Sequence, residues 1–220
     1  MSAVTSAAGG TEDVVDLVRA AIHQGEFVPN QRLVEADLSV QFGASRAAVR
    51  TALVQLAAEG LVERVQNRGA RVRAVSLDEA IEICEVRMVV EGLCAAKAAE
   101  RASEDDLALL REIAADMRRA VDGGDVFAYS ELNRRLHAAV RATGGQRVAD
   151  GVLERLRGQN VRHQFRLALL PGRASVSLPQ HLEIVDAICA RDPERAEAAM
   201  RAHLASVIET LPQVGSSPGR

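Results

Sequence analysis

Hydrophobic positions along the first sixty residues follow a helical period. Apolar residues recur every three to four positions in residues 11–25, from about Val34 to Phe42, and from Ser45 to Gly60. Gly43 separates the last two segments, and Ser45 is a residue type that favours the start of a helix. The pattern therefore predicts three helices, the last two joined by a tight turn.

A different pattern follows directly. Residues 61–65 and 70–75 alternate apolar and polar side chains with a period of two, on either side of the sequence Gln66-Asn67-Arg68-Gly69. Alternation of this kind predicts two strands, and a glycine at the tip favours a hairpin between them. A helix-turn-helix followed by a two-stranded wing predicts a winged helix-turn-helix domain over residues 11–75.

From Ser76 onward the chain shows only helical periodicity. Two segments have the Ser-x-x-acid form of a capping box, at Ser76 and Ser103, and glycine or proline pairs interrupt the pattern at residues 123–124, 144–145, 171–172 and 192–193. About six helices result, which predicts an all-α bundle over residues 76–212 and a mainly α protein. Residues 1–10 and 213–220 are expected to be disordered.

Composition supports a globular protein. With 220 residues and 48% hydrophobic content, the chain can fill a substantial core. Its apolar runs are far shorter than the roughly 20 residues that cross a bilayer, and the first residues lack a signal-peptide pattern, so we expect a cytoplasmic protein with no membrane partner. The three cysteines form no C-x-x-C pair and are expected to be buried apolar residues.

Charge is unevenly distributed. The net charge is −3, yet the segment from Arg32 to Arg73 contains seven arginines and four acidic residues. A local positive excess in the predicted winged domain favours a nucleic-acid partner for that part of the chain.

The third predicted helix has the features of a DNA-recognition helix. In a helix-turn-helix the first turn of the second helix reaches the major groove, and here that turn is Ser45-Arg46-Ala47-Ala48-Val49-Arg50. Arg46 and Arg50 share one face because they are four residues apart. Their planar guanidinium groups can hold a guanine edge or a phosphate with two hydrogen bonds. Arg68 and Gly69, at the tip of the wing, could approach the DNA backbone or minor groove.

Three histidines fall on the inward stripes of three separate predicted helices. His203 lies among Met200, Leu204 and Val207, His181 begins a stripe with Ile184 and Val185, and His137 follows Asn133 by one turn. Buried imidazoles need polar partners, since an unpaired group costs about 1 to 3 kcal/mol. Position alone leaves two alternatives open: separate partners for each ring, or one divalent metal shared by all three. His23 and His163 lack such a context and are expected to be structural.

Arg87 also lies on an inward stripe, with Ile83 and Cys94. A buried arginine requires a negative partner. Two candidates are an internal acid such as Glu91, one turn later, and the carboxylate of a bound effector, which we favour.

The residues of the first domain resemble the winged-helix domain of the GntR family of bacterial regulators. The resemblance lies in Arg32–Leu38, Phe42–Leu53, Leu56–Val62 and Asn67–Ala70. It implies sequence-specific binding to a palindromic operator by a homodimer. The DNA-contacting residues that it and the recognition helix indicate are Arg32, Ser45, Arg46, Ala47, Ala48, Arg50, Arg68 and Gly69.

The second domain is similar to the FCD ligand-binding domain of the FadR subgroup. The similar segments are Glu85–Arg87 with Glu91, Asn133–His137, His181–Ile188 and Arg201–Leu204. FCD domains often bind zinc or nickel at such residues. The resemblance therefore implies a divalent metal, with zinc expected and nickel as the alternative, held by His137, His181, His203 and Asn133. The family commonly has Asp where Asn133 stands. Its ligands are mostly small organic acids, for which Arg87 is the predicted binding residue.

Together these features predict a transcription regulator, a repressor whose operator affinity responds to a small organic acid at a metal site. One alternative is a regulator for which zinc or nickel is itself the signal. Another is a metal-dependent hydrolase, in which Glu183 is the acid available as a general base. We expect no enzymatic activity.

Overall fold

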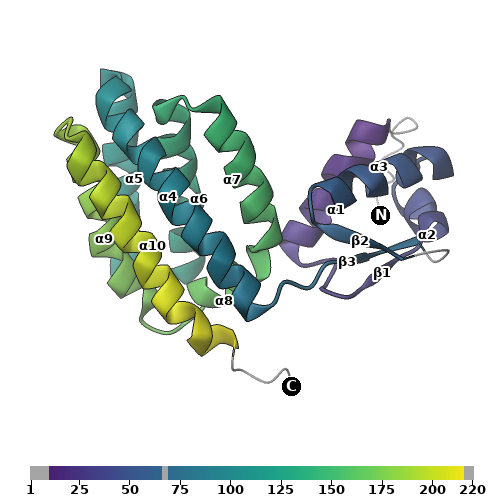
Figure 1. Cartoon of the computed structure of the whole chain (residues 1–220). Helices are drawn as coiled ribbons and strands as arrows, with labels where there is room; N and C mark the ends of the chain where they lie inside the picture. The colour runs from purple at the N-terminus through teal and green to yellow at the C-terminus, as the bar shows by residue number, and fades with distance from the viewer. Residues whose placement is uncertain (1–9, 66–68, 216–220) are drawn as a thin grey trace. The chain divides into compact units, whose positions relative to one another are not determined.

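The computed structural model describes residues 10–65 and 69–215. Their chain folds into two compact units: the first ends at Val75 and includes the short segment 157–162, and the second contains the remaining residues from Ser76 onward. The first unit is a winged helix-turn-helix and the second is a helical bundle, which confirms the predicted fold class (Figure 1).

The first unit consists of three helices and a small sheet. Its elements are α1 (Thr11–Gln24), β1 (Arg32–Leu33), α2 (Glu35–Gln41), α3 (Arg46–Ala58), β2 (Val62–Val65) and β3 (Gly69–Val72). Within the described residues the strands form one antiparallel sheet in the order β1-β3-β2. The helix-turn-helix and the paired strands of the wing follow the prediction.

Strand β1 is an addition that the hydrophobic pattern does not predict. With two residues it is too short to display a period, and it pairs Leu33 with Ala70 of β3. Gly69 has a φ of +87°, and a Cβ at this position would lie only 2.8 Å from the carbonyl oxygen of Leu33. Glycine is therefore required here by the close approach of β1, independently of any contact with DNA.

A buried apolar cluster orients helix α3. Val14 and Val18 of α1 belong to the same cluster as Val49, Leu53 and Leu56 of α3, and each of these side chains is at most 4% exposed. Because these positions lie on one face of α3, the opposite face is turned to solvent.

Seven helices of the described residues make up the second unit, except for the segment 157–162, which includes the end of α7 and the start of α8. They are α4 (Leu77–Arg101), α5 (Glu104–Asp122), α6 (Val126–Gly144), α7 (Arg147–Gln159), α8 (Val161–Ala168), α9 (Arg173–Cys189) and α10 (Pro193–Gly215). The predicted breaks all occur. The additional break separates α7 from α8 at Asn160, where the sequence has Gly158 and Asn160 instead of the glycine or proline pairs that mark the other breaks.

Caps begin several of these helices as predicted. The Ser103 hydroxyl accepts a hydrogen bond from the Asp106 amide at 3.1 Å, and the Asp106 carboxylate accepts one from the Ser103 amide at 2.9 Å. Ser76 caps α4 by accepting from the Glu79 amide at 3.2 Å. Helix α10 continues to Gly215, so residues 213–215 are helical rather than part of the expected disordered tail. Residues 1–9 and 216–220, also expected to be disordered, lie outside the described residues.

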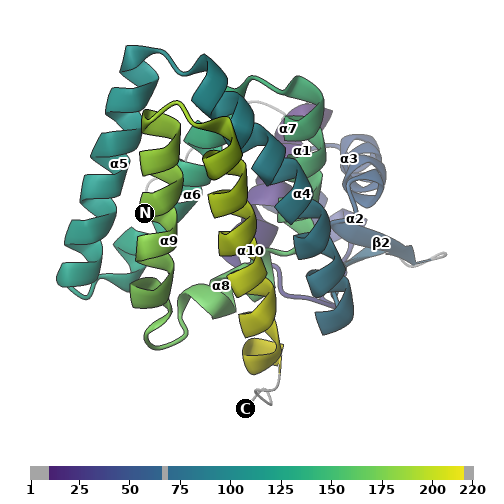
Figure 2. The same ribbon diagram turned by 60° about the vertical axis from the view of Figure 1, so that its left-hand side comes forward.

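Helix α4 is central to the bundle. It packs against α6 and α10, α9 lies beside α10, and α5 packs against α6 and α9 (Figure 2). Gly144 of α6 permits the contact with α4, because a Cβ there would lie 2.6 Å from the carbonyl oxygen of Cys94. No helix of the described residues combines the length and the apolar character needed to cross a membrane.

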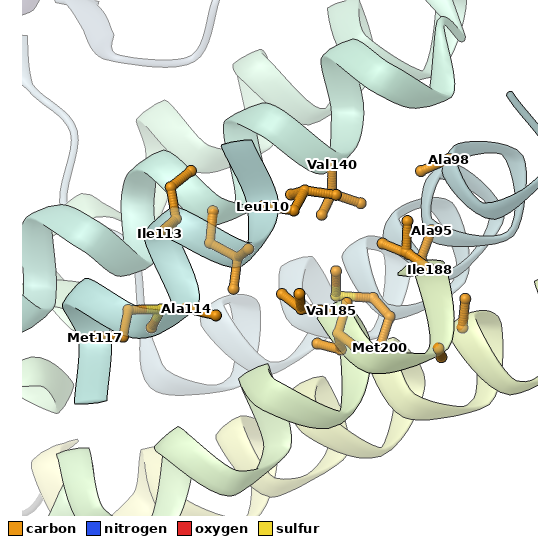
Figure 3. Packing of buried hydrophobic residues seen from close by; sticks show 14 of the residues in the cluster. Ala95, Ala98, Leu110, Ile113, Ala114, Met117, Val140, Val185, Ile188 and Met200 are labelled. Atoms are coloured by element: carbon orange, nitrogen blue, oxygen red, sulfur yellow. The ribbon is translucent and has the colours of Figure 1, made fainter. Parts of the chain in front are cut away.

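The core of the bundle is aliphatic. Leu110 and Met117 of α5 pack with Val140 of α6 and with Val185 and Ile188 of α9, close to a row of alanines on α4 (Figure 3). Small residues on α4 let its neighbours approach closely. Against this apolar background, a group of buried polar side chains in α4, α6, α9 and α10 stands out.

Candidate functional site

Helix α3 presents the predicted recognition surface. Ser45 is its N-cap, and the Ser45 hydroxyl accepts a hydrogen bond from the Ala48 amide at 3.1 Å. Arg46, Ala47 and Arg50 are exposed, and Ala48 is partly exposed. The first turn of α3 is therefore accessible, although Ser45 also has the structural task of capping the helix.

Arg50 has a partner that the sequence analysis did not identify. Its guanidinium donates hydrogen bonds through Nε and Nη2 to the carboxylate of Glu35 in α2, with Nη2 2.9 Å from Oε2. The Arg50 side chain remains 62% exposed, so the ion pair holds it at the surface. The hydrogen bond from Arg50 lowers the pKa of Glu35. This pairing orients Arg50 without burying it.

The other predicted DNA contacts lie in or near the sheet. Arg32 is exposed on β1, where its Cα pairs with that of Arg71 on β3. Arg71 in turn forms an ion pair with Glu63 across the hairpin at 2.9 Å. Gly69 begins β3, and Arg68 lies outside the described residues. Two neighbouring strands thus present arginines at the surface of the winged unit.

The three predicted histidines come together in the bundle. His137 of α6, His181 of α9 and His203 of α10 are 5%, 1% and 4% exposed. One ring nitrogen of each lies within 4.8 Å of those of the other two, and the ring centroids are 4.2 to 5.7 Å apart. We call these residues the histidine triad. Donor atoms gathered from three helices at this separation form a candidate metal centre.

Each ring of the triad is oriented through its Nδ1 atom. His137 Nδ1 is 2.5 Å from the Glu91 carboxylate, His181 Nδ1 is 2.9 Å from the Tyr129 hydroxyl, and His203 Nδ1 is 3.1 Å from the Gln180 side-chain oxygen. The Nε2 atom of His181 is buried and has no hydrogen-bond partner. Partners at Nδ1 leave Nε2 as the nitrogen available to a metal, the usual arrangement for histidine ligands.

Burial keeps two of the rings neutral. The pKa values of His181 and His203 lie well below the ordinary value, chiefly because burial disfavours the charged form and also because the other imidazoles and Arg173 are close. Neutral imidazole is the form that binds a metal.

Asn133 supplies a candidate oxygen ligand. It lies one turn before His137 on α6, and its side-chain Oδ1 atom is buried without a hydrogen-bond partner. An unpaired buried carbonyl oxygen raises the free energy of the folded state, so a ligand bound at this atom would stabilise the protein. Three nitrogens and one amide oxygen make a donor set that zinc or nickel can accept.

Arg87 pairs with the internal acid. Its guanidinium contacts the Glu91 carboxylate at 2.7 Å, and both side chains are at least 94% buried. Glu91 therefore accepts hydrogen bonds from Arg87 through one oxygen and contacts His137 through the other. The sequence left two partners open for Arg87, Glu91 and an effector carboxylate. In the structure Arg87 is paired with Glu91.

Tyr129, Gln180 and Arg173 were missed as members of this polar group. Tyr129 is the single tyrosine of the chain, and Gln180 precedes His181 directly. Arg173 lies two turns before His181 on α9 and is 7% exposed. For Arg173 the available signal was its spacing of four residues from Ser177 and of eight from His181, which places the three on one stripe of α9.

Glu183 and His163 are not members of the triad. Glu183, the general base considered for a hydrolase, forms a surface ion pair with Arg195 at 2.7 Å. Because its side chain is 47% exposed and engaged there, it is not positioned beside the triad. His163 is buried on α8, and the side chain of His23 lies outside the described residues.

The fold defines a class of protein, the DNA-binding regulators that use a winged helix-turn-helix. Residues 11–72 match the model of the bacterial regulatory proteins of the gntR family, and residues 82–206 match the FCD domain. The chain belongs to the GntR family and carries an FCD domain, as its resemblance implied.

Individual relatives agree with this assignment. The chain is 26% identical to the HTH-type transcriptional repressor RspR of Escherichia coli K12, over 92% of this chain and 89% of RspR. It is 28% identical to the "Putative L-lactate dehydrogenase operon regulatory protein" of the same organism. The match covers 96% of this chain and 89% of that protein. In fold it resembles McbR/YncC of E. coli, with a TM-score of 0.78, 22% identity and coverage of 92% and 97%. The two named sequence relatives are a repressor and an operon regulatory protein, in agreement with the family models, which identify the chain as a transcriptional regulator.

Proposed function

We propose that this regulator is a repressor whose affinity for its operator is controlled by a small organic acid, bound together with a divalent metal ion at the histidine triad. The observation that carries the proposal is the orientation of the triad. All three rings are held through Nδ1, and the buried Nε2 atom of His181 has no partner among the described residues.

The residues present fit a metal. His137, His181 and His203 would hold it through Nε2, and Asn133 would add an amide oxygen. A bound zinc or nickel ion supplies Lewis acidity, which favours oxygen donors such as carboxylate and hydroxyl groups. Glu91 contributes through His137, since a carboxylate at Nδ1 strengthens the histidine as a ligand.

Two relatives favour a metabolic role. One is named for an L-lactate dehydrogenase operon and another, which is 29% identical, for a D-xylose utilization operon. L-lactate is a small hydroxy acid of the class that a metal with open positions would accept. An effector of this class is consistent with a buried polar site inside an aliphatic bundle.

On the DNA side, we assign Arg46 and Arg50 of α3 to base or phosphate contacts. One short recognition helix reads few base pairs, so a homodimer on a palindromic operator is part of the proposal. Exposed apolar side chains on α4, Val86, Val89 and Leu93, are spaced three and four residues apart and share one face. A second copy of the chain would cover this face.

Effector and operator sites would be linked through the populations of two conformations. A coupling free energy of about 1 to 3 kcal/mol changes operator affinity roughly 5- to 150-fold. We expect release of DNA when the acid binds. If metal alone changed operator affinity, with no acid present, the metal itself would be the signal.

Metal analysis of the purified protein tests the central claim. We expect one zinc or nickel ion per chain, and loss of that ion in His137→Ala, His181→Ala and His203→Ala. His163→Gln is the matched control, because it changes a buried histidine outside the triad and should keep the metal. Removal of the metal with a chelator should lower the free energy of unfolding, by about 2.7 kcal/mol if free metal was at 100 times Kd. A wild-type protein that binds neither ion would refute the proposal.

A further inference from the structure

Three polar residues lie on the inner stripe of α9 at intervals of four. They are Arg173, Ser177 and His181, which are 7%, 5% and 1% exposed. On α10, which packs against α9, His203 is followed at helical spacing by Ser206 and Thr210. A polar column therefore runs from the histidine triad toward the first turn of α9.

At the end of this column, one nitrogen of the Arg173 guanidinium lacks a hydrogen-bond partner among the described residues. Its Nη1 atom donates to the Thr210 hydroxyl at 2.9 Å, to the Ser206 hydroxyl at 3.1 Å and to the Ser206 carbonyl oxygen at 3.4 Å. All three partners are uncharged. The Nη2 atom is buried and has no hydrogen-bond partner in the part of the chain that the structure describes.

The other buried arginines of the described residues differ in having acidic partners, although Nε and Nη1 of Arg141 also lack hydrogen-bond partners there. Arg87 is paired with Glu91 at 2.7 Å, and Arg141 is paired with Asp150 at 3.2 Å and with Glu154. For Arg173, burial lowers the pKa, and the opposing influence comes from Tyr129 rather than from a carboxylate. A buried cation with an unused donor and no anionic partner raises the free energy of the folded state, so a bound anion would stabilise it.

Arg173 is also electrostatically close to the triad. After burial and the other histidines, its positive charge is among the causes that lower the pKa values of His181 and His203. Tyr129 connects the two regions, because its hydroxyl contacts His181 Nδ1 at 2.9 Å and also interacts with Ser177. The shared stripe on α9 and the contacts of Tyr129 thus place Arg173 and the triad in one group of buried polar side chains.

We propose that Arg173 is the anchor for the carboxylate of the effector. The effector would be a small acid with a second oxygen group, a 2-hydroxy acid or a dicarboxylate, whose other end faces the triad. This inference rests on the proposed function, since it names the residue and the ligand chemistry of that same site. It assigns the anchoring role to Arg173 instead of Arg87, whose charge Glu91 already neutralises.

The test uses zinc-loaded full-length protein and calorimetric titration with lactate, malate, succinate and glutarate, each compared with its neutral amide. At least one acid should bind the wild type, and its amide should not. Arg173→Met should weaken binding of that acid roughly 10- to 100-fold, because a charge-assisted hydrogen-bond pair is lost. Arg173→Lys should recover part of the affinity, since it keeps the charge but not the planar fork. Arg195→Met, a surface change on α10, should leave acid affinity unchanged.

Stability distinguishes anchoring from a merely structural role. In the metal-free protein, Arg173→Met should leave the Tm unchanged or raise it, because it removes a buried cation without an ionic partner. It should also keep wild-type zinc affinity. A large fall in Tm with loss of zinc would make Arg173 a structural residue and overturn the inference, as would unchanged acid affinity or the absence of acid binding to zinc-loaded wild type. If the wild type binds nickel but not zinc, the same titrations are made with the nickel-loaded protein, and failure to bind either ion would instead refute the proposed function.

Discussion

At the scale of single residues, Glu91 connects two groups that the sequence presents as separate. One carboxylate oxygen accepts from Arg87, and the other contacts His137 Nδ1. Glu91 is 1% exposed, so its charge is stable only with these partners. The ion pair in α4 and the candidate metal centre therefore depend on the same side chain.

Glu91→Gln should separate these two roles. The substitution leaves Arg87 buried without a counter-charge, so we expect a loss of about 3 to 5 kcal/mol in the free energy of unfolding. It also removes the carboxylate behind His137, and zinc affinity should fall roughly 10- to 100-fold. Urea unfolding and competitive zinc titration measure the two effects.

The double variant Arg87→Met with Glu91→Gln provides the control. Removing the unpaired cation should restore most of the stability while zinc affinity stays low. Recovery of both properties, or of neither, would contradict the separate roles assigned to Glu91.

At the scale of elements, α3 has two faces with different tasks. Val49, Leu53 and Leu56 are buried in the winged unit, whereas Arg46 and Arg50 are exposed on the other side. Glu35 of α2 holds Arg50 through an ion pair whose members are 62% and 26% exposed, so the pair itself adds little stability. Its effect is on the direction of the Arg50 side chain.

Arg46→Ala and Arg50→Ala should each weaken specific binding, with the fold intact. For an operator selected from a random DNA pool, we expect a loss of about 1 to 3 kcal/mol if the arginine contacts a base. A phosphate contact would instead lower affinity for all sequences and reduce the salt slope by about one. Fluorescence anisotropy at several salt concentrations distinguishes the two cases.

Arg195→Ala serves as the control, since it also removes a surface arginine but from the bundle. Circular dichroism should show unchanged helix content in all three proteins. If Arg46→Ala and Arg50→Ala both bind the operator with wild-type affinity and salt slope, α3 is not the recognition helix.

At the scale of the whole molecule, the proposed homodimer would bring a second copy of the winged unit to the operator. Each winged unit offers one recognition helix, and twofold symmetry would double the number of base pairs read. The exposed apolar face of α4 is the surface assigned to that contact, with Val86, Val89 and Leu93 each more than 40% exposed.

Val89→Glu places a charge at the centre of this face and should produce monomers. Light scattering after size exclusion would measure the molecular mass. We expect operator affinity to fall at least tenfold, because each half-site of the operator is then bound by a separate monomer. Val148→Glu is the control, since Val148 is 85% exposed on α7 and lies outside the assigned face. A Val89→Glu protein that remains a dimer would show that the subunits meet elsewhere.

Much of the fold and part of the site follow from local patterns. Glycine and proline pairs mark most helix boundaries, Ser103 and Asp106 form the predicted capping box, and periodicity places three histidines on inward stripes. Each of these signals lies within a few residues of the chain, so it can be recognised in the sequence before any contact between distant residues is known. Strand β1 and the break at Asn160 lack any local signal of this kind.

The sequence by itself determined which side chains face the interior of each helix, and with them the two-domain architecture and the membership of the histidine triad. Only the tertiary structure decided how these side chains are paired. Glu91 contacts both Arg87 and His137, which is 46 residues away, and Tyr129 contacts His181. Among the described residues, Arg173 has no acidic partner. Partner choice depends on distances between helices that are far apart in the chain, and no local period encodes those distances.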